Sequence, residues 1–408
     1  MVSLLRSLLG AVLLVGAGAA VADPPQSAMT RSEAYARAAA LAAVGEKLFL
    51  DPSLSASGKL ACASCHSPDH AYGPSDALAV QLGGRDVRQP GLRAVPSLEY
   101  LQAIPQFTEH YYESEDEGDA SVDNGPTGGL TWDGRVDRGR DQAPVPLFSL
   151  FEMANDNAAA LAARIRRAGY AGDLSRIFGE HLFEDSEKTV AAIAEALEVF
   201  EQDQRFYPYS SKYDAYLAGN AALTPQEARG LALFNDSTKG NCNSCHRSER
   251  SKDGTPPQFT DYGLIAIGVP RNREIAANAD PAFFDLGMCG PLRTDLVGRS
   301  EYCGRFRTPS LRNVALRARF FHNGLVHSLR EAVAFYAERD ANPGKWYPRD
   351  AGGKIRKYDD LPPEYQNNIN NEPPFGNRPR GRPALMATEI DDIVAFLATL
   401  TDGYRAER

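Results

Sequence analysis

Residues 62–66 read C-A-S-C-H, and residues 242–246 read C-N-S-C-H. Each copy follows a Gly-x-x-Leu-Phe phrase, which is G-E-K-L-F at 45–49 and G-L-A-L-F at 230–234. Both segments therefore have one plan, in which a helix ends, a short polar loop follows, and the C-x-x-C-H motif comes next. Such a repeat predicts a tandem of two similar domains.

The C-x-x-C-H motif is the attachment pattern of haem c. Its two cysteines form thioethers with the vinyl groups of the haem, and the histidine then lies beneath the iron as the proximal ligand. A tetrahedral zinc site is the alternative for cysteine and histidine at this spacing, but zinc does not require a histidine directly after the second cysteine in both copies. We therefore predict two covalently bound haems c. The predicted attachment residues are Cys62, Cys65, Cys242 and Cys245, and the predicted iron ligands are His66 and His246.

The rest of the chain is patterned as helix and loop rather than sheet. Residues 187–200 have apolar side chains at helical spacing, and residues 224–227 form a capping box with proline at the first helical position. A further helix begins after Ser328 and turns Tyr336 inward, and a last helix is expected near 388–400. The fold class predicted is mainly α.

Two cytochrome c-type domains follow from the repeat and the helices. We place the N-terminal domain at 23–212, with one haem c, and the C-terminal domain at 213–408, with the other. The Pro- and Gly-rich stretch 343–381 is polar and interrupted, so we expect it outside the core.

The start of the chain has the order of a secretory signal peptide at 1–22. Arg6 precedes an apolar stretch at 8–15, and A-V-A at 20–22 marks the cleavage site. That stretch is too short to cross a bilayer, and no later one reaches ~18 uninterrupted apolar residues. We expect an exported, periplasmic protein without a membrane span.

The cysteines outside the motifs are Cys289 and Cys303. In an oxidising compartment a disulfide between them is the natural interpretation, and two unpaired buried thiols are the alternative.

The net charge argues against nucleic acid as a partner. Removing the leader removes Arg6 and takes the formal net charge from −9 to −10, and no basic face is visible. An acidic run at 113–123 is typical of a solvated loop, and it is also suited to steering a basic redox partner.

Several further phrases occur in order with the two motifs. They are W-D-G-R at 132–135, R-T-P-S-L-R-N at 307–313 and F-H-N-G at 321–324. Together these stretches resemble the bacterial di-haem cytochrome c peroxidase family, which includes MauG, over roughly residues 45–404.

The resemblance implies a division of labour between the two haems. His66 would serve a high-spin haem that binds hydrogen peroxide, and His246 a low-spin, six-coordinate haem. Trp132 matches the family's tryptophan between the haems. A carboxylate over the peroxide site can take a proton from one peroxide oxygen and return it to the other. The residues matching that site are Gln142, Pro146 and Glu152.

Position 336 distinguishes members of the family. In the cytochrome c peroxidases a methionine at this position ligates the low-spin iron, whereas MauG has a tyrosine there. This chain reads E-A-V-A-F-Y at 331–336. The resemblance therefore implies that Tyr336 is an iron ligand. Packing without iron binding is the alternative. At the family's calcium ligands the chain has Ala94 and R-A-R at 317–319, which puts calcium in doubt.

Three functions compete on this basis. The leading one is a MauG-like peroxidase that uses hydrogen peroxide to oxidise a protein or another reductant. The second is a cytochrome c peroxidase that takes electrons from small redox proteins, either cytochromes or cupredoxins. The third is an electron conduit with two six-coordinate haems and no oxidant chemistry.

Overall fold

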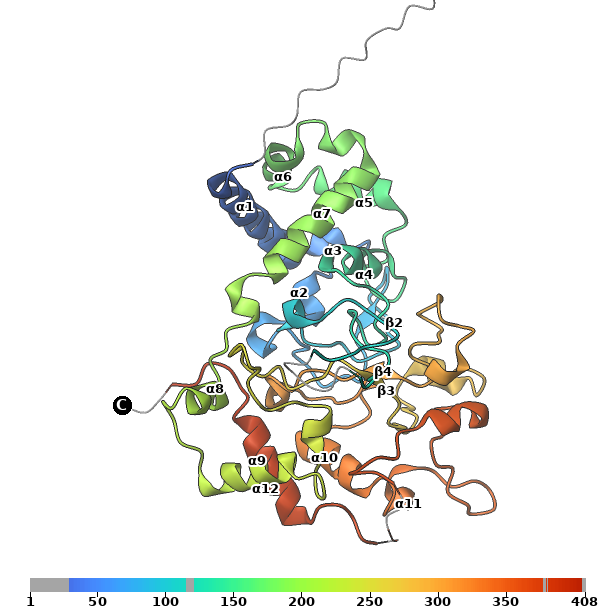
Figure 1. Ribbon diagram of the computed structural model, residues 1–408. Coiled ribbons are helices and arrows are strands. Elements are labelled where there is room, and N and C mark those ends of the chain that lie inside the picture. The colour runs from blue at the N-terminus through green and yellow to red at the C-terminus, as the bar shows by residue number, and fades with distance from the viewer. Residues whose placement is uncertain (1–28, 115–120, 377–378, 380, 406–408) are drawn as a thin grey trace, which may run out of the picture.

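The computed structural model describes residues 29–114, 121–376, 379 and 381–405, so the predicted signal peptide at 1–22 lies outside the described residues. The fold is mainly helical, as predicted, with two small antiparallel sheets near its middle (Figure 1). Within the described ranges, no helix is both long enough and apolar enough to cross a membrane.

The helices and strands have the following bounds. The helices of the first half are α1 (Arg31–Leu50), α2 (Cys62–Cys65), α3 (Gly139–Gln142), α4 (Pro144–Phe148), α5 (Ala158–Ile165), α6 (Ala171–Phe178) and α7 (Ser186–Glu201). Those of the second half are α8 (Lys212–Leu217), α9 (Pro225–Asn235), α10 (Leu329–Glu338), α11 (Pro343–Trp346) and α12 (Ala387–Ala398). The strands are β1 (Leu82–Gly83), β2 (Gln89–Pro90), β3 (Leu264–Ile265) and β4 (Phe306–Arg307).

The glycine of each Gly-x-x-Leu-Phe phrase lies where two long helices cross. A Cβ atom on Gly45 in α1 would lie 2.1 Å from the carbonyl oxygen of Ala196 in α7. A Cβ atom on Gly230 in α9 would lie 2.0 Å from the carbonyl oxygen of Asp392 in α12. Only glycine allows either approach, so the sequence repeat corresponds to a repeated helix crossing, α1 with α7 and α9 with α12.

The buried apolar side chains form two main clusters. The first runs from Leu41 to Phe206 and includes α1 and α7. The second runs from Tyr213 to Leu400 and includes α9, α10 and α12. This division lies near the predicted boundary, although the domains 23–212 and 213–408 themselves stay a prediction.

The expectation that residues 343–381 lie outside the core is wrong. Tyr347, Leu361, Ile369 and Phe375 are each at most 6% exposed. Phe375 packs its ring against the Arg339 guanidinium, 3.7 Å from the ring centroid. Each of these side chains is contributed to the core by a loop rather than by a regular helix or strand. Their burial therefore produces no helical or strand periodicity in the sequence.

Loops of the first half reach across to the second half. The β3 and β4 strands pair antiparallel, with Leu264 opposite Arg307. The Leu264 N–H donates to the carbonyl of Pro126, and the Arg307 N–H donates to that of Trp132, both at 2.8 Å. The segment that contains Trp132 is therefore joined by main-chain hydrogen bonds to the β3–β4 sheet of the second half.

Candidate active site

The first motif forms the short helix α2, and His66 directly follows it. The His66 N–H donates to the Cys62 carbonyl at 2.9 Å, and the His66 Nδ1 lies 3.0 Å from the Tyr72 carbonyl. A carbonyl partner requires the proton on Nδ1, which leaves Nε2 free to bind a metal. Burial lowers the pKa of His66 to about 4, so the imidazole is neutral at neutral pH.

The second motif repeats this arrangement on a 3-10 helix, Cys242–Ser244. The His246 N–H donates to the Cys242 carbonyl at 2.8 Å, and its Nδ1 lies 2.8 Å from the carbonyl of Phe259, which is fully buried. Burial lowers the pKa of His246 to about 4. Each histidine is therefore oriented by a main-chain carbonyl and presents Nε2.

The four cysteines of the motifs are free thiols that are partly buried. Burial raises the pKa of Cys62 and Cys242 to about 12, and that of Cys65 and Cys245 to about 11. Neutral thiols beside a neutral imidazole that is oriented for a metal suit thioether attachment with histidine ligation. The residues present thus fit two covalent haems c.

A cavity of about 440 Å³ opens beside the second motif. Cys242, Cys245 and His246 line it on one side, and the lining continues to Trp132 and to Pro96. Apolar and aromatic side chains form most of the wall, as is typical of cofactor sites.

Tyr336 lies in this cavity wall together with Leu329 and Val333, so the prediction that this helix turns Tyr336 inward is confirmed. Ser328 caps the start of the helix, and its hydroxyl accepts from the Glu331 N–H at 3.2 Å. The Tyr336 ring stacks on Phe375 at 5.4 Å. Among the described residues the Tyr336 hydroxyl has no hydrogen-bond partner, and burial raises its pKa well above the usual range.

Trp132 lines the same cavity, and main-chain groups determine its orientation. Its indole N–H donates to the carbonyl of Ala94 at 2.7 Å, and its own carbonyl accepts from the Arg307 N–H. Trp132, Tyr336 and His246 thus share one cavity.

The predicted peroxide-site residues lie at α3, at α4 and just after α4. Gln142 ends α3, Pro146 is in α4, and the Met153 N–H donates back to the Pro146 carbonyl at 3.0 Å. Glu152 is solvent-accessible, but surrounding protein atoms desolvate its carboxyl group and raise its pKa. The Glu152 charge also raises the pKa of Cys65, which places it near the first motif. The Gln142 side chain is partly buried and makes no hydrogen bond to another described residue, and the roles of all three stay predictions.

Sequence reasoning assigned no role to several groups that line the cavity. The His322 ring stacks on Phe306 with 3.5 Å between ring centroids, and burial lowers its pKa to about 4. Glu99 has its pKa raised to about 8 by burial and by the charge of Asp402. His322 and Arg307 belong to phrases that carried the family resemblance, whereas Glu99 has no sequence signal because its partner lies in the C-terminal segment.

The structure joins Cys289 and Cys303 in a disulfide, which closes a loop between β3 and β4. In the described part of the chain, no group of three or more His, Cys, Asp or Glu side chains is placed to hold a metal ion.

The two motifs, each with a histidine that presents Nε2, define the chain as a di-haem c-type protein. A family model described as di-haem cytochrome c peroxidase matches residues 39–222. The methylamine utilization protein MauG of Paracoccus denitrificans (strain Pd 1222) is 34% identical over 379 residues, which cover 89% of each chain. The chain therefore belongs to the di-haem cytochrome c peroxidase family, and it is a haem-dependent peroxidase that acts on hydrogen peroxide.

Other relatives span both branches of the family. The cytochrome c551 peroxidase of Nitrosomonas europaea is 27% identical, with 81% of this chain and 82% of that protein covered. A tyrosine-to-methionine variant of the di-haem peroxidase BthA from Burkholderia thailandensis superposes with a TM-score of 0.80 at 40% identity, covering 90% of this chain and 86% of that one. A MauG-like protein associated with microbial copper homeostasis gives a TM-score of 0.61 at 28% identity, covering 89% and 90%.

Proposed function

We propose that this peroxidase is of the MauG-like type, is exported to the periplasm, and uses hydrogen peroxide to oxidise a protein or another reductant. The position of Tyr336 is the observation that supports it. The Tyr336 side chain lines the cavity that contains His246, and its hydroxyl has no other partner among the described residues. A phenol oxygen in this place suits an iron ligand, and an anionic phenolate favours the oxidised states of iron.

The methionines give the complementary argument. Met153 is buried in the first core cluster, and Met288 is buried with Leu264 in a small separate cluster. Met386 is 61% exposed at the start of α12. Since none of the described methionines lines the cavity, a histidine and methionine pair at the second haem has no sulfur donor there.

Haem c supplies an iron that exchanges single electrons and, at the His66 site, a coordination position for peroxide. Glu152 acts on the protons: its carboxylate takes a proton from one peroxide oxygen and returns it to the departing oxygen. Its raised pKa suits this exchange, because an acid–base group is most effective when its pKa is near the working pH. Gln142 orients the peroxide with its amide, and the apolar ring of Pro146 limits the access of water.

Trp132 provides the route for charge between the two sites. The indole lines the cavity of the second haem, and its segment is bonded through main-chain groups to both halves of the chain. An indole that can be oxidised and is held rigidly loses little energy to reorganisation when an electron passes.

The electron paramagnetic resonance and near-infrared spectra of the ferric protein test the Tyr336 assignment. Tyr336→Phe removes only the hydroxyl, so we expect the low-spin signal to convert to a high-spin one. The matched control is Tyr358→Phe, because Tyr358 lines the same cavity and its hydroxyl already has a partner in Asp340 at 3.3 Å. A charge-transfer band of a methionine-ligated ferric haem in the parent protein would contradict the proposal.

The second candidate function is that of a cytochrome c peroxidase, and the similarity to the cytochrome c551 peroxidase of Nitrosomonas europaea supports it. It predicts that peroxide is consumed only after one haem has been reduced, whereas the MauG-like type predicts reaction with the fully oxidised protein.

Export is tested separately by sequencing the mature N-terminus, which we expect at Asp23.

A further inference from the structure

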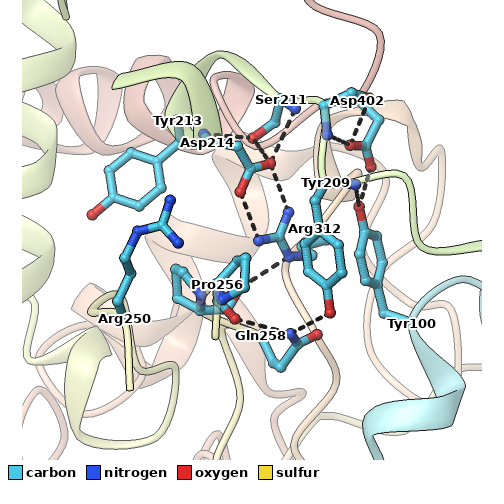
Figure 2. Close-up of polar contacts among 12 residues, drawn as sticks. Tyr100, Tyr209, Ser211, Tyr213, Asp214, Arg250, Pro256, Gln258, Arg312 and Asp402 are labelled. Carbon is cyan, nitrogen blue, oxygen red and sulfur yellow. Dashed lines mark hydrogen bonds and ion pairs between the residues drawn. The ribbon is translucent and has the colours of Figure 1, made fainter. Parts of the chain in front are cut away.

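Most of the buried arginines that the structure describes face a carboxylate. Arg312 donates to both carboxylate oxygens of Asp214, at 3.0 and 2.9 Å, and Figure 2 shows this pair beside Tyr100 and Tyr209. Other arginines with buried side chains also form ion pairs with carboxylates, namely Arg93, Arg271, Arg293 and Arg339. Pairing of this kind offsets the cost of removing a charge from water.

Arg307 is an exception. It is 8% exposed, yet no carboxylate of the described residues lies within ion-pair distance of it. Its Nε donates to the Thr131 carbonyl at 3.1 Å, and its two terminal nitrogens form no hydrogen bond within the described part of the chain. Burial lowers the pKa of Arg307 to about 10, so it remains a cation at neutral pH. Its side chain lines the cavity that contains His246.

Arg317 is half-buried and is a second exception in the same cavity wall. One terminal nitrogen donates to the Val95 carbonyl at 2.9 Å, and Nε lies 3.4 Å from the Arg319 carbonyl. Among the described residues it too has no carboxylate partner, and burial lowers its pKa to about 10. Its charge contributes to the lowered pKa of His66, so it lies close enough to act on the first site as well.

We propose that Arg307 and Arg317 are the anion-binding residues of this cavity and that each binds a carboxylate of haem, namely a propionate. A guanidinium group binds carboxylates through paired N–H donors, and an unpaired buried cation is costly unless an anion joins it. Each haem c carries two propionates, and a cavity lined by Cys242 and His246 must admit them with the ring. The inference rests on the attachment of two haems, which the family and the motifs support.

The test compares Arg307→Gln and Arg317→Gln in the holoprotein by resonance Raman spectroscopy of the haem propionate-bending bands. We expect these bands to shift in both variants, because the propionate loses its charged donors. We also expect the reduction potential of the adjacent haem to fall, because removing a positive charge disfavours the added electron. Arg317→Lys keeps the charge without the paired donors, so its band shift should be smaller.

Arg319→Gln is the matched control. It removes the same charge two residues away, but Arg319 already pairs with Glu274 at 2.9 Å. If either glutamine variant fails to fold, Arg307→Lys or Arg317→Lys replaces it, with a smaller band shift as the expected result. Unshifted bands in folded variants at both positions would overturn the proposal, because the propionates would then not contact these arginines. Haem content is measured on the same samples, so that failure of the propionate proposal can be distinguished from failure of the proposed function. Fewer than two haems c per chain would count against the proposed function.

Discussion

The indole N–H of Trp132 donates a 2.7 Å hydrogen bond to the carbonyl oxygen of Ala94. The Ala94 N–H in turn donates to the His322 carbonyl at 2.7 Å, and the Trp132 carbonyl accepts from the Arg307 N–H at 2.8 Å. Main-chain groups from both halves of the chain therefore determine how this side chain stands in the cavity wall. An orientation set in this way suits a group that passes charge between two sites.

Trp132→Phe keeps an aromatic ring but leaves the Ala94 carbonyl without its donor. We expect electron exchange between the haems to slow in stopped-flow absorption while both haems remain attached. Leaving a buried polar group unpaired should lower the free energy of unfolding by about 1–3 kcal/mol. Trp346→Phe is the control, because the buried indole N–H of Trp346 has no partner among the described residues. Equal kinetics for the two variants would remove Trp132 from the route.

Glu152→Gln keeps the size of the side chain but removes its acid–base function. We expect hydrogen peroxide consumption to slow by ~10²-fold or more, the usual scale of this kind of catalysis. In the parent the rate should rise with pH through the raised pKa of Glu152, since the carboxylate form accepts the proton. The variant should lose this rise. Glu184→Gln serves as the control, because Glu184 lies on the surface and, among the described residues, forms an ion pair only with His181, at 2.8 Å. A rate for Glu152→Gln as high as that of this control would exclude Glu152 from the mechanism.

Local patterns in the sequence predicted the local parts of the structure. The spacing of the haem motifs and the cap of α10 at Ser328 both act within a few residues. The carbonyls that orient the histidines, from Tyr72 and Phe259, come from loops without periodicity.

Contacts between distant parts of the chain leave no local signal. Arg93 pairs with Asp285, 192 residues later, and Glu99 lies beside Asp402 near the end of the described chain. Spacing arguments cannot identify such pairs, because they depend on how the two halves pack. For the same reason the unpaired state of Arg307 emerges only when its surroundings are known.

The Cys289–Cys303 disulfide should contribute to stability through the loop it closes. With 14 residues of separation, the chain-entropy estimate is about 3 kcal/mol. We expect the double substitution Cys289→Ser, Cys303→Ser to lower the free energy of unfolding in urea by this order. Haem content should stay at the parent value, because the loop lies outside both motifs. Mass spectrometry of non-reduced peptides checks the bond, and alkylation of both thiols in the native parent would contradict it.

The ion pair of Arg312 and Asp214 should contribute more to the free energy of unfolding than a surface ion pair does. Figure 2 shows Asp214 facing the Arg312 guanidinium and the start of α8, where it also accepts from the N–H and hydroxyl of Ser211 at 3.0 and 2.7 Å. Removing one member of a buried pair typically costs about 3–5 kcal/mol. We expect Asp214→Asn to lose most of that amount at pH 7, because the asparagine keeps a hydrogen-bonding side chain but leaves Arg312 without an anion. Asp391→Asn removes one carboxylate from the exposed pair with Arg330 and should cost at most about 1 kcal/mol.

The pH dependence of this pair distinguishes charge pairing from packing. Burial alone would raise the pKa of Asp214, but the hydrogen bonds and charge of Arg312 outweigh it, and the pKa is lowered from 3.8. A lowered pKa in the folded state gives stability that is present above the unfolded value and is lost as the pH falls through the folded value. The difference in unfolding free energy between the parent and Asp214→Asn should therefore be constant from pH 7 to about pH 5 and shrink below about pH 4. Urea unfolding at pH 7, 5 and 3 measures it, and a difference that stays unchanged at pH 3 would assign the effect to packing rather than to the ion pair.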